Sequence, residues 1–309
     1  MVALSLMSVG CGDAEPSYLK ELRVASPPNK LPTVLKTNGP FSRPIFRIAI
    51  DDMRAAVVTE ANPKDQYIIW STNDLRNWTW RAFTPGLPSA LLPRDRLYWF
   101  VKGALLSEDY TNQPQQIPFP YDGAILDLVP DGSNFLAVSG TSGLYDLSET
   151  GHWSTLATVG ATEQLTTVTR TAQGICAAAS NTRNIWFWTD PKSNPVSAAL
   201  PAIVGSPKQI VATSLHAYVL TGTGLLEGDL KCGSWKEMSL PPETGGRYSL
   251  ASRGTELYLA TASGLYRYDG NVWSPFPTQV TRAFVRRLRA INGMLYACHQ
   301  LESDHVWRM

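Results

Sequence analysis

Short apolar runs, separated by turn-forming residues, follow one another along most of the 309-residue chain. The runs at residues 135–139, 218–221 and 257–261 are rich in aliphatic and aromatic side chains, and each ends in Ser or Thr. Runs this short predict β-strands rather than helices. The dipeptides Asp131-Gly132 and Asn292-Gly293 favour hairpin turns between neighbouring strands, because both residues tolerate a positive φ. The pattern therefore predicts an all-β chain.

The strand pattern repeats. Gly-Leu pairs begin at Gly143, Gly224 and Gly264, with spacings of 81 and 40 residues, and a tryptophan follows each pair. A period near 40 residues with four short strands in each unit is typical of a β-propeller blade. We therefore predict a single seven-bladed β-propeller, with six or eight blades as the alternatives.

The period divides the chain into units at residues 46–88, 89–122, 123–162, 163–205, 206–246, 247–281 and 282–309. The last unit is one strand short. Residues 18–24 are expected to supply the missing strand and so to close the ring, which removes an exposed sheet edge. Three parts follow: 1–16 as a signal and anchor, 17–45 as a closing strand with a Pro-rich connector, and 46–309 as the propeller.

Polar turns ending in tryptophan carry a resemblance to a known family. The segment from Ser71 to Trp78, Ser-Thr-Asn-Asp-Leu-Arg-Asn-Trp, resembles the Asp-box of sialidase-type BNR repeats. Shorter turns end at three later tryptophans. The resemblance implies structural roles: a polar side chain caps the turn, and the tryptophan packs in the core. The residues given these roles are Ser71, Asn73, Trp78, Trp153, Trp235, Asp269 and Trp273.

The segment Ile45-Phe46-Arg47-Ile48 is similar to the sialidase motif Phe/Tyr-Arg-Ile-Pro, with Ala49 in place of the proline. In that family the arginine grips the substrate carboxylate. No later segment stands out as the other two arginines or as the Tyr/Glu nucleophile pair. No catalytic residue is therefore predicted, and we expect no sialidase activity.

A basic cluster lies in the first strand of the last unit, at Arg286, Arg287 and Arg289. Strand alternation sends Arg287 and Arg289 to one face and Arg286 to the other. First strands line the channel of a propeller, and Arg170 and Arg253 fall near comparable positions. Together these residues predict a cationic channel mouth for an anionic ligand or an acidic partner loop, and Arg47 is a further candidate binding residue. The alternative is that each arginine is satisfied locally.

Tryptophans outside the boxes are candidates for exposed binding platforms, with Trp80 and Trp99 as the leading pair. Tyr98, Trp186 and Trp188 belong to the same group, although alternation exposes only one side of residues 185–188. Such platforms suit either proteins or glycans.

Composition narrows the function further. The chain has 27 basic and 26 acidic residues, a net charge of +1, so no global field attracts nucleic acid. Its four histidines show no zinc spacing, and neither a metal nor a cofactor is predicted. Four cysteines do not form a disulfide framework. Cys176 and Cys298 are expected on equivalent second strands, three blades apart, too far for a disulfide.

The first residues, MVALSLMSVG, are apolar and uncharged, and Cys11-Gly12-Asp13 follows them. This resembles a bacterial lipobox with Cys11 as the lipidated residue, although Ser8 replaces the preferred leucine and no basic residue precedes the run. The alternative is a buried first strand. The favoured hypothesis is a non-catalytic lipoprotein scaffold of the bacterial envelope, at the periplasmic side of the outer membrane or the cell surface, that binds envelope proteins. A carbohydrate-binding propeller and a divergent glycoside hydrolase are the alternatives.

We expect the mature chain to begin at a lipid-modified Cys11 and to partition into the detergent phase, because acyl chains anchor it to the membrane. Cys11→Ser should move it to the aqueous phase. An intact, unmodified Met1, found by mass spectrometry on protein from the native envelope, would contradict this.

Overall fold

The computed structural model describes strands between residues 17 and 60, residues 67–276 with short gaps, and strands between residues 285 and 308. Side chains are described from residue 54 to residue 276, again with gaps. The predicted all-β architecture is confirmed: six antiparallel sheets have four strands each, and a further sheet has three. One 3₁₀ turn, Ala202–Val204, is also present. None of the described residues form a helix long and apolar enough to cross a membrane.

The first three sheets comprise β5 (Ile45–Asp51), β6 (Arg54–Glu60), β7 (Tyr67–Thr72) and β8 (Thr79–Thr84); β9 (Ala90–Pro93), β10 (Leu97–Val101), β11 (Ala104–Glu108) and β12 (Gln115–Ile117); and β13 (Ile125–Asp131), β14 (Asn134–Ser139), β15 (Gly143–Leu147) and β16 (Trp153–Thr158). The next three comprise β17 (Leu165–Thr171), β18 (Gly174–Ala179), β19 (Asn184–Trp188) and β20 (Val196–Ala199); β21 (Pro207–Ala212), β22 (Ala217–Thr221), β23 (Leu225–Gly228) and β24 (Lys236–Glu237); and β25 (Arg247–Arg253), β26 (Glu256–Thr261), β27 (Gly264–Tyr268) and β28 (Trp273–Pro275). The last sheet comprises β29 (Val285–Ile291), β30 (Met294–His299) and β31 (Val306–Arg308).

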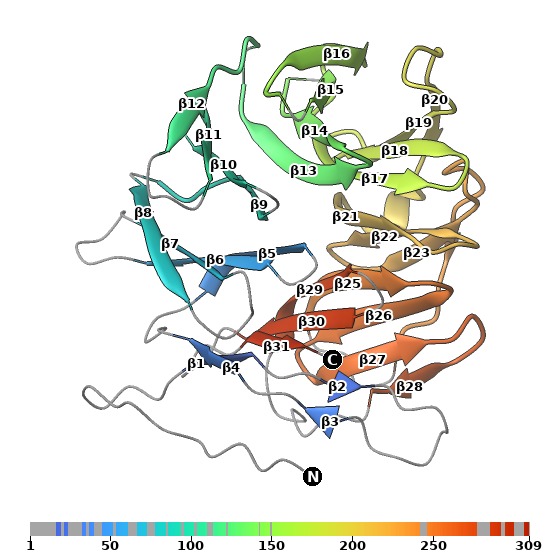
Figure 1. The fold of residues 1–309 in the computed structure, drawn as a ribbon. Helices are drawn as coiled ribbons and strands as arrows, with labels where there is room; N and C mark the ends of the chain where they lie inside the picture. The colour runs from blue at the N-terminus through green and yellow to red at the C-terminus, as the bar shows by residue number, and fades with distance from the viewer. Residues whose placement is uncertain are drawn as a thin grey trace.

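The sheets follow one another around a ring (Figure 1). The first strand of each sheet lies beside the first strand of the next, in the order β5, β9, β13, β17, β21, β25 and β29, and β29 lies beside β5. Because neighbouring strands are antiparallel, the turns of every sheet lie at two opposite ends of the strands. The turns between first and second strands and between third and fourth strands share one end, which we name the turn end. First strands begin at the opposite end.

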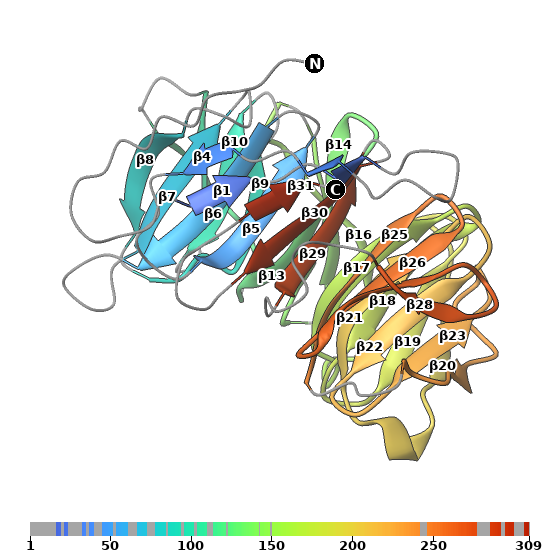
Figure 2. The same ribbon diagram turned by 90° about the horizontal axis from the view of Figure 1, so that it is seen from below.

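The N-terminal strands differ from the prediction. The expected closing strand is two short strands, β1 (Ser17–Leu19) and β2 (Leu22–Arg23), which pair with β4 (Thr37–Gly39) and β3 (Thr33–Val34). The expected connector thus contributes strands of its own, because partners close in sequence cost less loop-closure entropy than distant ones. β1 still lies beside β31, the last strand of the three-stranded sheet (Figure 2).

The second strands form the core. In β10, β18 and β22 every residue is buried, with no alternation. Sheets cover these strands on both faces, so a continuous apolar run replaces the alternating pattern of a one-sided sheet. The fourth strands β20 and β24 are mostly exposed.

A β-bulge recurs near the start of the first strands. In six of them the register slips by one residue, and the residue after the slip is here named the post-bulge residue. The post-bulge residues are Arg47, Asp127, Thr167, Gln209, Ser249 and Arg287. An apolar residue follows each: Ile48, Leu128, Val168, Ile210, Leu250 and Leu288.

Post-bulge side chains join neighbouring sheets. Asp127 Oδ2 accepts hydrogen bonds from the Val168 N–H and the Thr167 hydroxyl, both at 3.0 Å. Thr167 Oγ1 accepts from the Ile210 N–H at 3.4 Å. Gln209 Oε1 accepts from the Leu250 N–H at 2.9 Å, and its amide nitrogen donates to the Leu250 carbonyl at 2.9 Å. In each case the donor N–H belongs to the residue after the next post-bulge residue.

We expect Gln209→Leu to lower the free energy of unfolding by about 1–3 kcal/mol, because it leaves the N–H of the buried Leu250 without its acceptor. Lys208→Leu, at the exposed neighbouring position, should change it by less than about 0.5 kcal/mol. Urea unfolding of both variants checks this. Equal stability of the two would show that the contact contributes nothing.

Candidate functional site

The candidate binding residues Arg47, Arg286, Arg287 and Arg289 lie on strands β5 and β29, which are neighbours in the ring. Arg47 and Arg287 are both post-bulge residues, opposite Val58 and Cys298. Their side chains, with those of Arg286 and Arg289, lie outside the described part. The sialidase-like tripeptide, residues 46–48, therefore occupies the same register in its strand as residues 126–128, 166–168 and 208–210 do in theirs. It is one copy of an internal repeat.

The expected division of faces in the last sheet needs correction. Arg286 stands at the slip in register between Val285 and Arg287. A bulge inserts an extra residue and interrupts the alternation of side chains. The strand period therefore does not place Arg286 and Arg287 on opposite faces.

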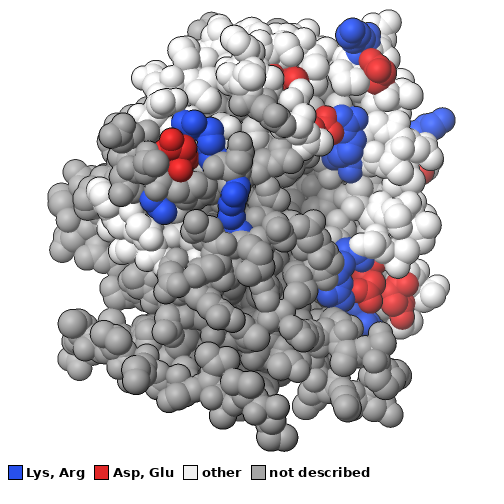
Figure 3. Space-filling view, viewed as in Figure 1, with Lys and Arg blue, Asp and Glu red and all other residues white. Residues whose placement is uncertain are grey.

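Arg170 and Arg253, predicted at comparable positions, lie toward the turn end and each has an acidic partner. Arg170 Nε donates to Asp131 Oδ1 at 2.8 Å, and its Nη2 forms an ion pair with the same carboxylate. Arg253 Nη2 lies 3.0 Å from Glu256 Oε2. In the view of Figure 3, basic and acidic side chains lie mostly beside one another. These two arginines are satisfied locally and do not form a cationic mouth.

Two Tyr/Glu pairs, which the sequence did not reveal, lie near the turn end, one within β26 and the other between β22 and β23. The hydroxyl of Tyr258 donates to Glu256 Oε2 at 2.6 Å, and Tyr218 stands opposite Glu227 in the β22–β23 ladder. Burial and then the charge of Glu227 raise the pKa of Tyr218 to about 12. Both tyrosines are almost fully buried. They are neutral, inaccessible phenols, unsuited to nucleophilic attack, and Tyr218 packs in the core between the fifth and sixth sheets.

Glu256 remains ionised within this cluster. Burial alone would raise its pKa, but hydrogen bonds from Tyr258 and Arg253 and the charges of Arg253 and Arg267 lower it below the ordinary value. Arg267 Nη1 lies 3.3 Å from Glu256 Oε1. All the contacts described for this carboxylate are therefore structural ones, with Tyr258, Arg253 and Arg267.

The two candidate tryptophan platforms have different surroundings. Trp80 is 41% exposed on the outer strand β8, whereas Trp99 is 1% exposed and packs with Leu91 and Val101. The expectation of a Trp99 platform is wrong, because sheets cover both faces of β10. Tyr98 and Trp188 are buried for the same reason, and Trp186 is half-buried.

The turns between third and fourth strands are capped by polar side chains. Asp269 Oδ1 accepts from the N–H groups of Asn271 at 2.9 Å and Val272 at 3.0 Å, and these bonds lower its pKa. Asp229 Oδ1 does the same for Lys231 at 2.8 Å and Gly233 at 3.1 Å. Sequence reasoning missed a further capped turn, at Asp190. Each cap orders its loop.

The tryptophans of these turns pack at the margin of the core. Trp78, Trp153, Trp235 and Trp273 are half-buried rather than fully buried. Trp235 lies over Gly228, where an added Cβ would come within 2.8 Å of the ring. Trp273 packs against the core around Tyr218 and donates to the Ser239 carbonyl at 2.8 Å.

Ser71 has a different role from that of the turn caps. It is buried on β7, and its hydroxyl accepts from Arg81 Nε at 2.7 Å. Arg81 Nη1 lies 3.6 Å from Glu108 Oε1, in the next sheet. This buried inter-sheet ion pair gave no sequence signal. Asn73 and Cys11 lie outside the described residues.

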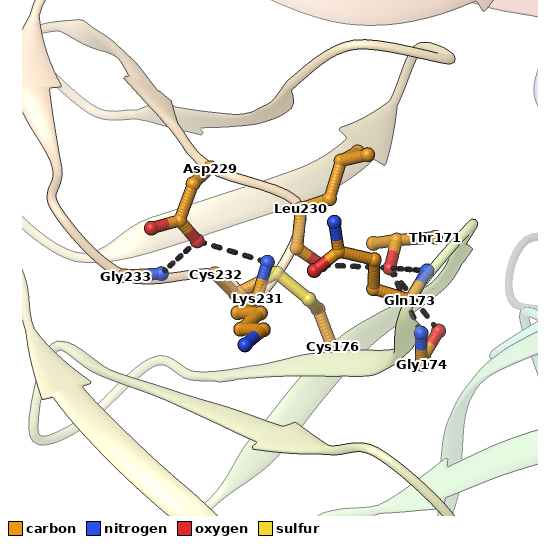
Figure 4. Close-up of a disulfide and its surroundings, with 9 residues drawn as sticks. All are labelled: Thr171, Gln173, Gly174, Cys176, Asp229, Leu230, Lys231, Cys232 and Gly233. Carbon is orange, nitrogen blue, oxygen red and sulfur yellow. Dashed lines mark hydrogen bonds between the residues drawn. A yellow bond between two sulfur atoms is a disulfide. The ribbon is translucent and has the colours of Figure 1, made fainter.

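A disulfide joins the fourth and fifth sheets (Figure 4). The number of cysteines did not predict this bond. Cys176 on β18 bonds to Cys232 in the turn after β23, with Cα atoms 6.3 Å apart, and both residues are buried. Close by, the Thr171 hydroxyl donates to the Leu230 carbonyl at 2.8 Å. Cys176 therefore pairs with Cys232. Cys176 and Cys298 do lie on second strands, as predicted.

The described residues contain no group of three or more His, Cys, Asp or Glu side chains placed to hold a metal ion. The candidate site that remains is the meeting point of the neighbouring strands β29 and β5, which carry Arg47, Arg286, Arg287 and Arg289.

Solved structures share this arrangement of sheets. The WD40 beta propeller domain of Doa1 aligns with a TM-score of 0.62 and 12% identity, over 94% of this chain and 95% of that one. Virginiamycin B lyase from Staphylococcus aureus gives 0.68 and 11%, over 85% and 94%. BamB from Moraxella catarrhalis gives 0.59 and 16%, over 93% and 91%.

The chain therefore has a β-propeller fold. No protein-family model and no curated protein sequence matches it. At such low identities the similarity extends to the fold alone, and function has to be argued from this chain's own residues.

We expect Trp273→Ala to lower the free energy of unfolding by about 2–4 kcal/mol, less than the about 3–5 kcal/mol for a fully buried tryptophan. Val272→Ala, at a side chain that is 61% exposed, is the control and should leave it nearly unchanged. Thermal unfolding of both variants checks this. A Trp273→Ala protein as stable as wild type would rule out the structural role.

Proposed function

We propose that the chain is a non-catalytic, lipid-anchored β-propeller of the bacterial cell envelope that acts as a protein-interaction scaffold within a larger envelope assembly. Cys11 carries the anchor, and partner proteins contact the end at which the first strands begin. Arg47, Arg286, Arg287 and Arg289 supply the basic residues there. Trp80 is a further contact on the outer strand of the first sheet.

The observation that carries the envelope assignment is the Cys176–Cys232 disulfide. Disulfides form and persist in oxidising compartments such as the periplasm and the cell surface, and are rare in the cytosol. This one joins two sheets through the core, where neither sulfur is exposed to solvent. It fits a structural bond formed once, during folding outside the cytoplasm, and so agrees with the lipobox-like sequence before Cys11.

The structural contacts of the described acidic and basic side chains support the scaffold role. Hydrogen bonds or ion pairs to other residues of the chain engage four of these groups in holding the sheets and turns: Asp127, Arg170, Glu227 and Glu256. The fold also accommodates catalysis, since virginiamycin B lyase has a similar structure. In this chain the sialidase-like tripeptide is a repeat element, and the tyrosines of the Tyr/Glu pairs are buried. Both features favour binding over hydrolysis.

The ring is proposed to have seven blades. Six four-stranded sheets and one three-stranded sheet lie at the predicted period of about 40 residues, and β29 lies beside β5. β1 completes the last blade by packing along β31 rather than by the strand pairing first expected. Packing of this kind still covers the outer edge of the last sheet.

Photo-cross-linking in intact cells tests the function. A photoreactive amino acid at Lys208, exposed near the start of β21, should capture envelope proteins. The same probe at Lys231, exposed at the turn end, is the control and should capture fewer. Cys11→Ser should abolish capture by removing the anchor. No adduct at position 208, together with glycan binding or with turnover of a sialoside, would contradict the proposal.

A further inference from the structure

The outer strand of each sheet has main-chain groups that face away from the sheet, and proteins protect such edges with bulges, charges, prolines or very short strands. Of the six outer strands in the four-stranded sheets, five are protected in one of these ways. β8 and β16 each contain a bulge, and β24 consists of two charged residues. β12 and β28 have three residues each, with prolines on both sides of β12 and one within β28.

The outer strand of the fourth sheet, β20, has none of these protections. Its four residues, Val196–Ala199, are uncharged, include no proline and pair with β19 without a slip in register. Val196 is 67% exposed, more than any other large hydrophobic side chain in the described part of the chain, and Ser197 and Ala199 are exposed as well. The strand lies on the outer wall of the ring (Figures 1 and 2).

The hydrogen bonds between β19 and β20 show which main-chain groups face outward. The Leu200 N–H donates to the Arg183 carbonyl at 3.0 Å, directly after the end of β20. In an antiparallel pair, residues that bond to the partner strand alternate with residues that do not. The residues two and four positions before Leu200 therefore bond inward to β19. The N–H and C=O groups of Ser197 and Ala199 point away from the sheet.

We propose that this edge binds an extended segment of a partner protein, which adds to the fourth sheet as a fifth strand. The segment would accept hydrogen bonds from the N–H groups of Ser197 and Ala199 and donate to their carbonyls, as in other cases of β-strand addition. This inference rests on the proposed scaffold function, and it adds a contact surface on the outer wall of the ring and the kind of partner that fits it.

The size of the edge favours a single segment over a second copy of the chain. Four residues of a strand span about 13 Å, and Pro195, which has no N–H to donate, directly precedes them. Two rigid rings joined at this edge would pair over that length only, whereas a stable interface buries at least about 1,200 Å². A single extended segment depends less on the rest of the ring, because its own side chains can pack on both faces of the sheet beside β20.

The surroundings of the edge favour uncharged side chains in the segment. On one face Val196 stands opposite Phe187, and on the other Ser197 stands opposite the half-buried Trp186. β20 itself offers no charge to pair with an ionic side chain. A β-branched or aromatic residue in the segment would pack beside the exposed Val196, as cross-strand neighbours do within a sheet.

The test uses the full-length chain, labelled with ¹⁵N, and the peptide acetyl-Thr-Val-Thr-Val-Thr-amide. Amide hydrogen exchange followed by NMR examines the edge directly. Without peptide, the N–H groups of Ser197 and Ala199 should exchange fast, and that of Ala198 between them slowly. Saturating peptide should slow exchange at the two outward positions by about tenfold or more. The same peptide with every backbone nitrogen methylated cannot donate and should leave both rates unchanged.

The decisive variant is Ser197→Pro, which removes an outward N–H and no hydrogen bond of the β19–β20 ladder. Proline is tolerated on an edge strand where the N–H faces solvent. The variant should therefore unfold close to the wild-type temperature, while its affinity for the peptide falls about tenfold or more. Ser197→Ala is the matched control. It keeps the main-chain donor and should leave the affinity within about twofold.

Four results would overturn the inference. They are no binding of the peptide to wild type, undiminished binding to Ser197→Pro, equal losses in the proline and alanine variants, and protection at Ser197 and Ala199 that rises with protein concentration without peptide. The last result would identify a second copy as the occupant.

If Ser197→Pro fails to fold, Ala199→Lys places a charge on the edge and should weaken binding severalfold. Unchanged affinity in that variant would count against the site. Envelope adducts at position 208 without peptide binding would refute this inference alone. Peptide binding without adducts would refute the scaffold function.

Discussion

Main-chain N–H groups at the junctions between neighbouring sheets need acceptors, and side chains of the preceding sheet supply them. A β-bulge near the start of a first strand leaves one side chain placed to reach the neighbouring sheet. Asp127, Thr167 and Gln209 use this placement to satisfy the N–H groups of Val168, Ile210 and Leu250. A buried N–H without a partner is costly, so these contacts fix how adjacent sheets meet. The ring and the position of its basic residues follow from that geometry.

The turn end has its own reinforcement. Aspartates such as Asp229 and Asp269 cap the turns before the fourth strands, and the Cys176–Cys232 bond ties one of these turns to the preceding sheet. Cys232 has a φ of 55°, a conformation that residues other than glycine seldom adopt. Its N–H donates to the Asp229 carbonyl at 2.9 Å, the neighbouring N–H groups of Lys231 and Gly233 donate to the Asp229 carboxylate, and with the disulfide these bonds hold Cys232 there. The capped turns and the disulfide therefore make this end of the molecule rigid.

Charge is distributed between the two ends in different ways. At the turn end Arg170, Arg253 and Arg267 lie against carboxylates, so their charges are neutralised within the fold. Where the first strands begin, basic residues outnumber acids, and Arg47 and Arg287 stand in positions that are filled elsewhere by acceptors.

The all-β class, the period near 40 residues and the capped turns can be predicted from the sequence, because each depends on neighbours close in the chain. A run such as residues 257–261 predicts a strand, and Asp269 predicts a cap, without knowledge of any other sheet. The sequence could also locate Arg47 and Arg287, but it could not show that they share a register, since a bulge appears only when two strands pair. No local sequence signal predicts the burial of Trp99, the ion pair between Arg81 and Glu108, or the partner of Cys176. Each of these joins residues in different sheets or depends on sheets covering both faces of a strand, and such contacts form when the ring brings distant segments together.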